Sequence, residues 1–339
     1  MSTCFASTYQ ASSGRLPSSP TSGFEIPVVD FVRDSPSTAQ QIVSHAATTD
    51  GLAFVRNLPH QPDFLAIQRL FDNLYQSPQL AARLNSTYEK RGVFKLAGKL
   101  TDDPTVDDKA TIDLSAHRLQ HIQDYQLLQD LGTEFETTVK FFEAVEKQLV
   151  PLVLHATASV IGKNVDLHSI HQERNNNFRL IDYHSSASSL RHGCGEHRDY
   201  GTATIIFQDG SGGLEFQDPQ TDEWHSVPGH ETIIVWGWSG HVLSGGKAVA
   251  IKHRVKSIGG PRRNTAVCFI APDLETSLQP LVGNSCGFAE RIAQGHVKVG
   301  GFKDLMGKTW RWREGTQREG TQASNLDQDR DVFKFLYHN

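Results

Sequence analysis

The sequence has few cysteines and no long hydrophobic run. Its four cysteines, Cys4, Cys194, Cys268 and Cys286, are widely separated among 339 residues and form no Cys-x-x-Cys pair. They show neither the Cys-x-x-Cys spacing of a cysteine-based zinc site nor the cysteine density of a disulfide-rich framework, so we expect a reducing, cytoplasmic location. A helix that spans a membrane needs about 18 consecutive apolar residues. The sequence has no such run, and we therefore expect no membrane span.

The chain also lacks a surplus of basic residues. It has 33 Lys and Arg against 38 Asp and Glu, a formal net charge of −5. A general nucleic-acid-binding protein normally carries a basic surplus, so we expect a small-molecule partner, with no nucleic acid and no membrane. The composition of the whole chain, 38% hydrophobic and 21% charged, is typical of a globular protein with a sizeable core. The length allows two domains or one large β domain with helical additions, and it leaves the oligomeric state open.

The first half of the sequence divides into a polar tail and a mixed region. Residues 1–23 are rich in Ser, Thr and Pro and lack the apolar stretch of a secretory signal, so we expect a disordered tail. Residues 24–174 are expected to form an N-terminal α/β region. Its long amphipathic helix, from about 135 to 162, should be kinked or broken at Pro151. Between 91 and 119 the pattern is weak and polar, which predicts a loop with some helix.

The pattern changes near Asn176. Short runs rich in β-branched and aromatic residues follow one another, separated by Gly, Pro, Asp and Ser. This spacing of strands and turns is typical of a sandwich or barrel, and it predicts a β core over residues 175–276. Strand-like runs stop after Pro272 and helical patterns return further on. Residues 277–339 are therefore expected to form a C-terminal helical extension.

A candidate metal site begins in the segment CGEHRDYGTATIIFQ. His197 and Asp199 stand two positions apart, just before an alternating, strand-like run. Residues i and i+2 of a strand face the same side, so both side chains can reach one metal ion. His253, in IKHRVKS, is the best candidate for a third ligand on a later strand. Two histidines and one carboxylate on one face of an octahedron hold Fe(II) and leave positions open for substrate chemistry.

Two further residues suggest a receptor for a carboxylate. Arg263 and Thr265, in RNTAVCF, are again at i and i+2 of an expected strand. A buried guanidinium beside a hydroxyl binds a carboxylate well. Arg191 precedes the metal motif on an expected loop, where it either contacts an acidic or phenolic substrate or faces solvent. Cys194 is expected to be a small buried thiol.

The order of these motifs carries more information than any one of them. The chain resembles the Fe(II)/2-oxoglutarate-dependent dioxygenases of the isopenicillin N synthase-like family from Phe24 to about Leu281. The resemblance is carried by His-x-Asp, His-Arg-Val and Arg-x-Thr in this order, and by the segments IPVVDF, DGLAFVRNLPH, FRLIDYH, GGLEFQDPQTDEWHSVPG and GWSGHVLSGGKAVAIKHRV. The chain departs from the family where Thr265 replaces a common serine and Trp238 a common aspartate. These departures leave the substrate open.

The resemblance implies a fold and a set of site residues. The fold is mainly β with flanking helices, and its core over residues 175–276 is a distorted double-stranded β-helix, or jelly roll. The metal ligands, which are also the expected catalytic residues, are His197, Asp199 and His253. Arg263 would bind the distal carboxylate of the co-substrate 2-oxoglutarate, assisted by hydrogen bonds from Thr265 and Tyr183. The cofactors so implied are Fe(II), 2-oxoglutarate and O₂.

The resemblance also implies a reaction. An enzyme of this kind oxidises a small organic substrate, here expected to belong to natural-product biosynthesis, by hydrogen abstraction. The outcome is hydroxylation, desaturation or ring rearrangement, with release of succinate and CO₂, and the sequence does not select among them. Three alternatives remain at this point: an iron oxidase of the same fold that does not use 2-oxoglutarate, a zinc hydrolase with the same ligands, and a non-catalytic jelly-roll binding protein.

Overall fold

The structure is a computed structural model that describes most of the chain. The described residues are 25–88, 92–97, 107–162, 164–172, 175–183, 192–256, 262–283, 287–314 and 327–338. The expected tail over residues 1–23 and the candidate substrate residue Arg191 lie outside these ranges. Within them, no helix combines the length and the apolar character that crossing a membrane requires.

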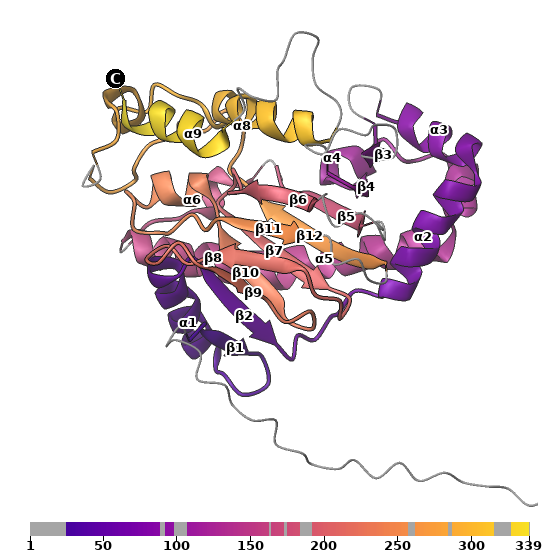
Figure 1. The fold of residues 1–339 in the computed structure, drawn as a ribbon, viewed down its shortest axis with the longest axis horizontal. Helices are drawn as coiled ribbons and strands as arrows, with labels where there is room; N and C mark the ends of the chain where they lie inside the picture. The colour runs from indigo at the N-terminus through magenta and orange to yellow at the C-terminus, as the bar shows by residue number, and fades with distance from the viewer. Residues whose placement is uncertain are drawn as a thin grey trace, which may run out of the picture.

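Two sheets form the core of the molecule (Figure 1). Across the larger sheet the strands are Val28–Asp30 (β1), Leu52–Arg56 (β2), Thr232–Trp236 (β10), Ala203–Gln208 (β7), Arg263–Ile270 (β12), Asn177–Tyr183 (β5), Lys109–Asp113 (β4) and Phe94–Ala97 (β3). Across the smaller sheet they are His192–His197 (β6), His253–Lys256 (β11), Leu214–Gln217 (β8) and Trp224–Ser226 (β9). From β5 to β12 the chain passes back and forth between the sheets, so the predicted double-stranded β-helix is confirmed.

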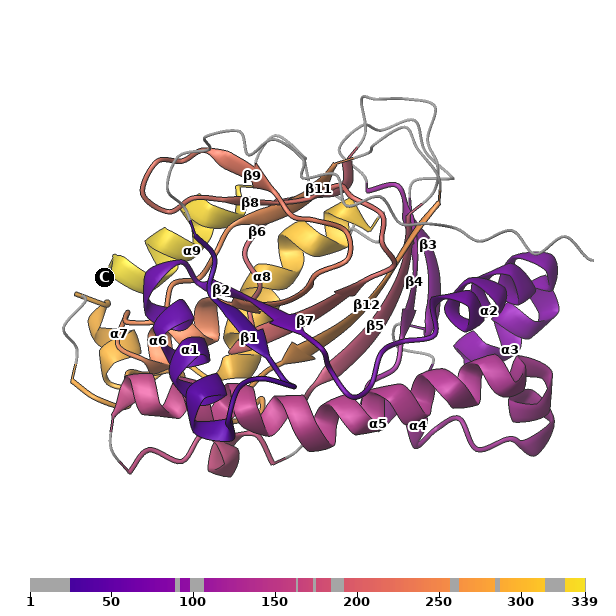
Figure 2. The same cartoon turned by 90° about the horizontal axis from the view of Figure 1, so that it is seen from below.

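Helices surround this β core. They are Pro36–Thr49 (α1), Phe64–Gln76 (α2), Pro78–Ser86 (α3), Ala116–Leu119 (α4), Tyr125–Ile161 (α5), Trp238–Leu243 (α6), Glu290–Ala293 (α7), Val299–Arg313 (α8) and Gln328–Tyr337 (α9), with a 3-10 turn at His168–Ile170. Figure 2 shows the long helix α5 on one side of the larger sheet and the smaller sheet on the other. The expectation of a β core with flanking helices is therefore confirmed.

Helix α5 buries one face against the larger sheet. Its N-cap, Asp124, accepts a hydrogen bond from the backbone N–H of Leu127 at 2.5 Å, which satisfies a free donor of the first turn. Phe142 stacks on Phe178 of β5 with ring centres 4.5 Å apart, and Phe141 meets Phe207 of β7 edge-on at 4.9 Å. Full burial of each such ring stabilises the fold by about 1.5–3 kcal/mol. The helical apolar pattern in the sequence thus correctly predicts both the helix and its buried face.

The predicted break at Pro151 is wrong. Helix α5 continues through Pro151, and its irregular residue is instead Gly132, at φ 73°. Proline removes the hydrogen bond to the carbonyl four residues earlier, which belongs to Lys147. Because Lys147 is exposed, water can take the place of the missing donor. Gly132 adopts a left-handed conformation that residues with a Cβ rarely tolerate, and the helix changes direction there.

The prediction of a loop between 91 and 119 is also wrong in part. Strands β3 and β4 lie in this region and extend the larger sheet beyond β5. In β4 the residues that face the cavity side are Lys109, Thr111 and Asp113, all buried and all polar, so the polar residues of this strand lie inside the protein instead of facing water. The larger sheet takes strands from both sides of the expected boundary at 174/175. The division into 24–174, 175–276 and 277–339 remains a prediction.

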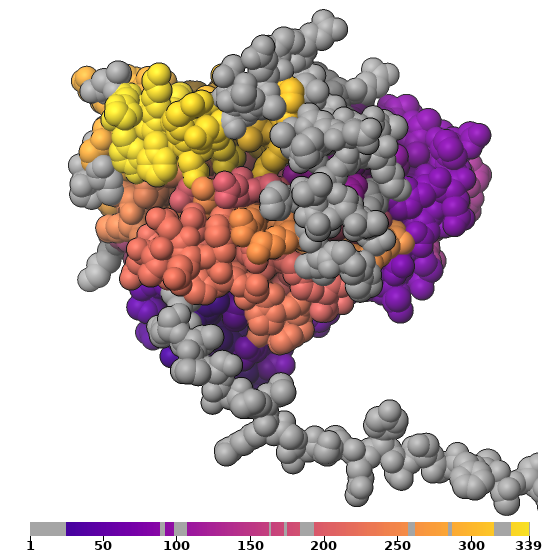
Figure 3. All heavy atoms as spheres, viewed as in Figure 1, coloured from indigo at the N-terminus to yellow at the C-terminus, as the bar shows by residue number. Residues whose placement is uncertain are grey.

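The C-terminal helices close one end of the β core. Phe302 and Met306 of α8 and Val332 and Leu336 of α9 form an apolar cluster with Trp238 of α6. Figure 3 shows these helices packed directly on the strands along one edge of the visible face. The helical patterns expected after the β core are confirmed by α8 and α9. The cluster fixes α8 so that its last residues reach the open side of the larger sheet.

Candidate active site

The inner face of the larger sheet is the floor of a cavity of about 1130 Å³. Alternate residues of a strand share a face, and the strand register therefore sets which side chains line the cavity together. On β12 these are Arg263, Thr265, Val267 and Phe269; on β5 they are Tyr183, Ile181, Arg179 and Asn177; on β7 they are Ile206 and Thr204. One end of this surface carries Arg263 and Tyr183. The other end carries Phe269 and Thr204 and lies beside the expected metal ligands.

The three expected metal ligands meet at this second end. His197 ends β6 and pairs directly with His253, which begins β11, while Asp199 lies in the turn after β6. One ligand atom from each residue lies within 4.8 Å of the other two. The Nε2 atoms of His197 and His253 are 3.5 and 3.9 Å from the two Asp199 carboxylate oxygens. The structure thus brings together the residues that the sequence assigned to one metal.

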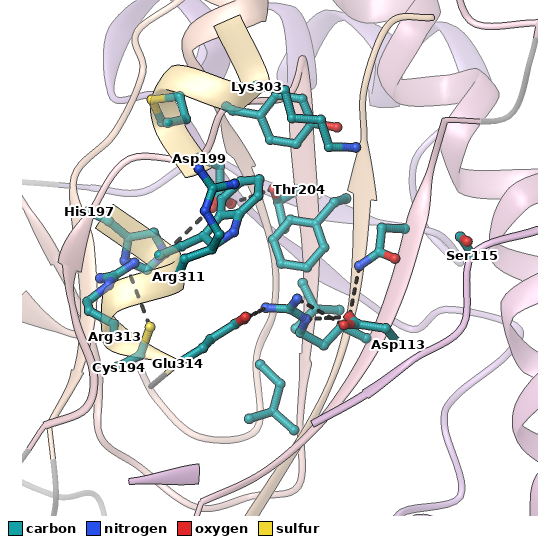
Figure 4. Close-up of a pocket in the computed structure, with 18 of the residues that line it drawn as sticks. Asp113, Ser115, Cys194, His197, Asp199, Thr204, Lys303, Arg311, Arg313 and Glu314 are labelled. Atoms are coloured by element: carbon teal, nitrogen blue, oxygen red, sulfur yellow. Dashed lines mark hydrogen bonds and ion pairs between the residues drawn. The ribbon is translucent and has the colours of Figure 1, made fainter. Parts of the chain in front are cut away.

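Hydrogen bonds orient these ligands. His197 Nδ1 donates to the carbonyl of Gly195 at 2.8 Å, and His253 Nδ1 lies 3.4 Å from the carbonyl of Ile251. The Nε2 atoms therefore face Asp199 and are the ring nitrogens that a metal would bind. Thr204 donates to Asp199 Oδ2 at 2.5 Å and fixes the carboxylate (Figure 4). Two imidazole nitrogens and one carboxylate oxygen on one side of an open cavity fit Fe(II).

The electrostatics of the cluster also fit a cation. Burial and the neighbouring charge of His197 lower the pKa of His253 to about 4. Burial opposes ionisation of Asp199, but the two histidines hold its pKa well below the usual range. Burial likewise disfavours charged His197, yet Cys194 and Asp199 raise its pKa to about 9. The cluster without metal thus retains a proton that a divalent ion would displace.

Arg263 is buried and incompletely hydrogen-bonded. Its Nη2 donates to Gln208 Oε1 at 2.9 Å, and its Cζ lies 4.7 Å from the centre of the Tyr183 ring. Neither Nε nor Nη1 has a hydrogen-bond partner within the described part of the chain, and the same holds for the Thr265 hydroxyl. Buried donors without partners are costly, and an anion with two acceptor oxygens would satisfy them. The residues present therefore fit the distal carboxylate of 2-oxoglutarate.

Tyr183 lies beside Arg263, as the sequence predicts. Its register partner across the sheet is Arg263 itself, and burial raises the pKa of its phenol. A Cβ at Gly193 would lie only 2.7 Å from the Tyr183 ring, so the absence of a side chain there makes room for the tyrosine. Contact between its hydroxyl and 2-oxoglutarate remains a prediction.

The sequence did not reveal a charged cluster opposite the metal ligands. Arg179 donates to Asp113 at 2.6 Å and to Glu314, the residue after α8, at 2.9 Å, and Lys95 lies 3.0 Å from Asp113. Asp113 and Glu314 are buried, and the neighbouring cations keep the pKa of each carboxyl below its ordinary value against the effect of burial. The sequence could have indicated Arg179, because an arginine at an inward position of a strand needs a buried partner. Nothing in the sequence indicated Glu314.

A second charged group joins β4, β6 and the end of α8. The Lys109 ammonium lies 2.7 Å from Asp107 and 3.4 Å from the sulfur of Cys194. Asp107 accepts from the backbone N–H of Gly195 at 2.9 Å, and its own N–H donates to the carbonyl of Arg313. Cys194 is buried, as expected; burial and Asp107 oppose ionisation, but Lys109 and other nearby cations lower its pKa to about 7.

The fold and the site together define a class of protein. Two histidines and one carboxylate with open positions are typical of non-haem iron oxygenases. Here they lie inside a double-stranded β-helix, beside a buried arginine and threonine whose donors lack partners.

Comparisons with known proteins agree with this class. Residues 171–272 match the model of the 2OG-Fe(II) oxygenase superfamily. The chain is 36% identical to clavatol oxidase of Penicillium crustosum over 110 residues, 30% of this chain and 32% of that protein. It is 25% identical to gibberellin 20 oxidase 3 of Arabidopsis thaliana over 289 residues, 78% of this chain and 74% of that protein.

A solved structure extends the likeness in fold. The dioxygenase for auxin oxidation 1 of Arabidopsis thaliana, in its 2-oxoglutarate complex, superposes with a TM-score of 0.61 at 20% identity and covers 76% of this chain and 96% of that one. This likeness supports the fold. The match to clavatol oxidase spans about a third of that protein's length.

Proposed function

We propose that the protein is an Fe(II)- and 2-oxoglutarate-dependent oxygenase that oxidises a small organic substrate. The observation that carries the proposal is the pairing of the three-ligand cluster with Arg263 and Thr265, whose buried donors have no partner within the described ranges. A dicarboxylate that reaches from the metal cluster to Arg263 would place one carboxylate at the metal and the other at the unpaired donors of Arg263 and Thr265. The 2-oxoglutarate complex of the auxin-oxidising neighbour supports this choice of co-substrate.

Each part of the site then has a separate role. His197, Asp199 and His253 hold the metal, which when bound supplies the oxygen chemistry. Arg263, Thr265 and Tyr183 would bind and orient 2-oxoglutarate. The remaining cavity, over Val267 and Phe269 and below the end of α8, is the place for the organic substrate. The walls position that substrate and exclude bulk water.

The cavity is large enough for two ligands. Its volume of about 1130 Å³ exceeds what a five-carbon dicarboxylate needs, and pockets for small organic ligands commonly range from about 300 to 1,000 Å³. The relatives are named for clavatol, gibberellin and auxin, all small molecules. We infer a small biosynthetic substrate of the same kind, handled in the cytoplasm. Hydroxylation, desaturation and ring rearrangement all remain outcomes of the proposed reaction.

The alternatives account for less of the site. An iron oxidase that does not use 2-oxoglutarate would leave the Arg263 and Thr265 donors buried and unsatisfied. A zinc hydrolase would need the same ligands but not the arginine, and a binding protein would need neither. The carboxylate receptor therefore favours the 2-oxoglutarate-dependent reaction.

Binding of 2-oxoglutarate to the anaerobic Fe(II) protein tests the proposal directly. We expect wild type to develop a metal-to-ligand charge-transfer absorbance on addition of 2-oxoglutarate. Breaking a buried charge pair costs about 3–5 kcal/mol, so Arg263→Gln should raise the Kd for 2-oxoglutarate roughly 100-fold or more.

The neighbouring Arg262 provides a matched control. Its guanidinium pairs with Asp182 and Asp72 instead of lining the cavity. Arg262→Gln removes the same charge from the adjacent position and should leave the Kd near that of wild type. Absence of the absorbance in wild type, or equal affinity in Arg263→Gln, would refute the co-substrate assignment.

A further inference from the structure

The cavity is more cationic than the protein around it. Among the described residues, ten Lys and Arg side chains line it against six Asp and Glu, although the whole chain has a net charge of −5. Fe(II) would neutralise Asp199, and 2-oxoglutarate would neutralise Arg263. Arg198 pairs with Asp329, which does not line the cavity. Among the remaining lining residues, Lys and Arg still outnumber Asp and Glu. This excess of positive charge favours an anionic second ligand.

Arg313 is a cation close to the metal ligands on the helical side. It ends α8, and its Nη1 donates to the carbonyl of Gly195 at 2.6 Å. The same carbonyl accepts from Nδ1 of His197, so the guanidinium and the imidazole are neighbours (Figure 4). Arg313 thus places a positive charge beside the metal site, on a helix instead of on the strand that carries Arg263.

One nitrogen of the Arg313 guanidinium is buried without a hydrogen-bond partner. Within the described ranges its Nε has none, and its Nη1 donates to the backbone carbonyls of Gly195 and Glu196. The nearby carboxylate of Asp107 is already occupied by Lys109 and by the N–H of Gly195. An arginine edge that includes Nε is the one that pairs with a carboxylate through two parallel bonds.

We propose that Arg313 binds a carboxylate of the organic substrate. The inference rests on the proposed function, because 2-oxoglutarate has two carboxylates and the site matches both, one at Arg263 and one at the metal. A further anionic group is needed to match Arg313. The same cavity is lined by three aromatic residues, Phe269, Tyr200 and Trp310. The rings of Tyr200 and Trp310 are in edge contact, with centres 6.0 Å apart. These rings favour a ligand with an apolar, ring-sized body. The substrate class is a small carboxylic acid that carries such a body.

Pairs of acids and their neutral amides test this inference. The probes are benzoic, cinnamic, indole-3-acetic and decanoic acids, each with its primary amide. Binding is measured by ligand-observed NMR on the full chain loaded with Zn(II), a diamagnetic substitute for Fe(II), and saturated with 2-oxoglutarate. In wild type we expect at least one acid to bind about tenfold or more tightly than its amide, as a charge-assisted pair predicts. In Arg313→Gln that preference should disappear.

Two further variants separate the role of Arg313 from general effects. Arg313→Lys keeps the charge and should restore part of the preference. Lys308→Gln removes a charge from the same helix at an exposed position that does not line the cavity, and it should leave the preference intact. If no acid is preferred by wild type, or if Lys308→Gln abolishes the preference as completely as Arg313→Gln, the inference is overturned.

The affinity for 2-oxoglutarate, measured on the same proteins, distinguishes the two levels of the argument. If wild type does not bind 2-oxoglutarate, the proposed function itself fails. If wild type binds it and Arg313→Gln binds it equally well while losing acid preference, both proposals stand. A large loss of 2-oxoglutarate affinity in Arg313→Gln would assign the arginine to the co-substrate and overturn the inference about the substrate.

Discussion

Arg263 and Arg313 line the same cavity but are carried by different kinds of element. Arg263 begins β12, which pairs with β5 from Arg263 onward and with β7 from Thr265 onward, in the middle of the larger sheet. Arg313 is the last residue of α8, a helix packed on the outside of the β core. A strand bonded on both edges holds its side chains in fixed register, whereas an added helix can change without disturbing the sheet. The comparison suggests that the sheet carries the shared chemistry and the helix the choice of substrate.

The two sides are nevertheless joined by buried charges. Glu314 reaches from the end of α8 to Arg179 of β5, and Asp107 before β4 binds both Lys109 and the strand that ends at His197. Substitutions on each side should therefore separate metal binding, co-substrate binding and closure of the cavity.

The largest effect is expected at the metal ligands. His253→Ala removes one of three groups that act together, and even removal of a hydrogen-bond partner of a ligand typically costs about 10–100-fold in metal affinity. We therefore expect Fe(II) affinity to fall on the order of 100-fold or more, and no 2-oxoglutarate absorbance to develop. Anaerobic Fe(II) titration measures the change. His230→Ala, at an exposed histidine far from the cluster in sequence, is the control, and equal metal affinity in the two variants would show that His253 is not a ligand.

An intermediate effect is expected at the junction between helix and sheet. Glu314→Gln keeps the shape of the side chain but removes the charge that faces Arg179, and loss of a charged hydrogen bond costs about 1.5–3 kcal/mol. Urea unfolding at neutral pH should show a decrease in the free energy of unfolding of that order. Unchanged stability would mean that α8 is held by its apolar contacts alone.

The pH dependence of this effect follows from the carboxyl group. The folded-state pKa of Glu314 is lower than its unfolded value, so its contribution is complete above the unfolded pKa and is lost as pH falls through the folded one. The difference in stability between wild type and Glu314→Gln should therefore shrink below about pH 4, near the ordinary pKa of a glutamate. A difference that grows on acidification would contradict this assignment.

The smallest effect is expected at Thr265. Its hydroxyl contributes one neutral hydrogen bond to the proposed co-substrate, worth about 0.5–1.5 kcal/mol, and Thr265→Val should raise the Kd for 2-oxoglutarate by roughly 2- to 12-fold. Without 2-oxoglutarate the hydroxyl has no partner within the described ranges, so the same substitution should not reduce stability. Titration and thermal unfolding measure the two properties. Destabilisation without any change in Kd would assign Thr265 to the core instead of the site.

The sequence predicted much of the site because its residues lie on regular elements. His197 and Asp199 are two positions apart next to a strand, and Arg263 and Thr265 are two positions apart within one, so period alone places each pair on one side. Helix α5 was predicted from its apolar stripe. Strand β4 was missed because its inward positions hold Lys109, Thr111 and Asp113, whose burial becomes visible only in the folded sheet, where β4 pairs with β5.

By itself, the sequence determined the candidate metal ligands and the candidate carboxylate receptor, since these depend on local spacing, and its resemblance to a known family, carried by the order of motifs, implied the jelly-roll core. Only the tertiary structure decided how the cavity is completed. The contact between Arg313 and Gly195 joins residues 118 positions apart, and that between Glu314 and Arg179 joins residues 135 apart. No periodicity connects such distant positions. Packing of α8 and α9 on the β core brings them together, and the charges then pair because burial leaves them no water.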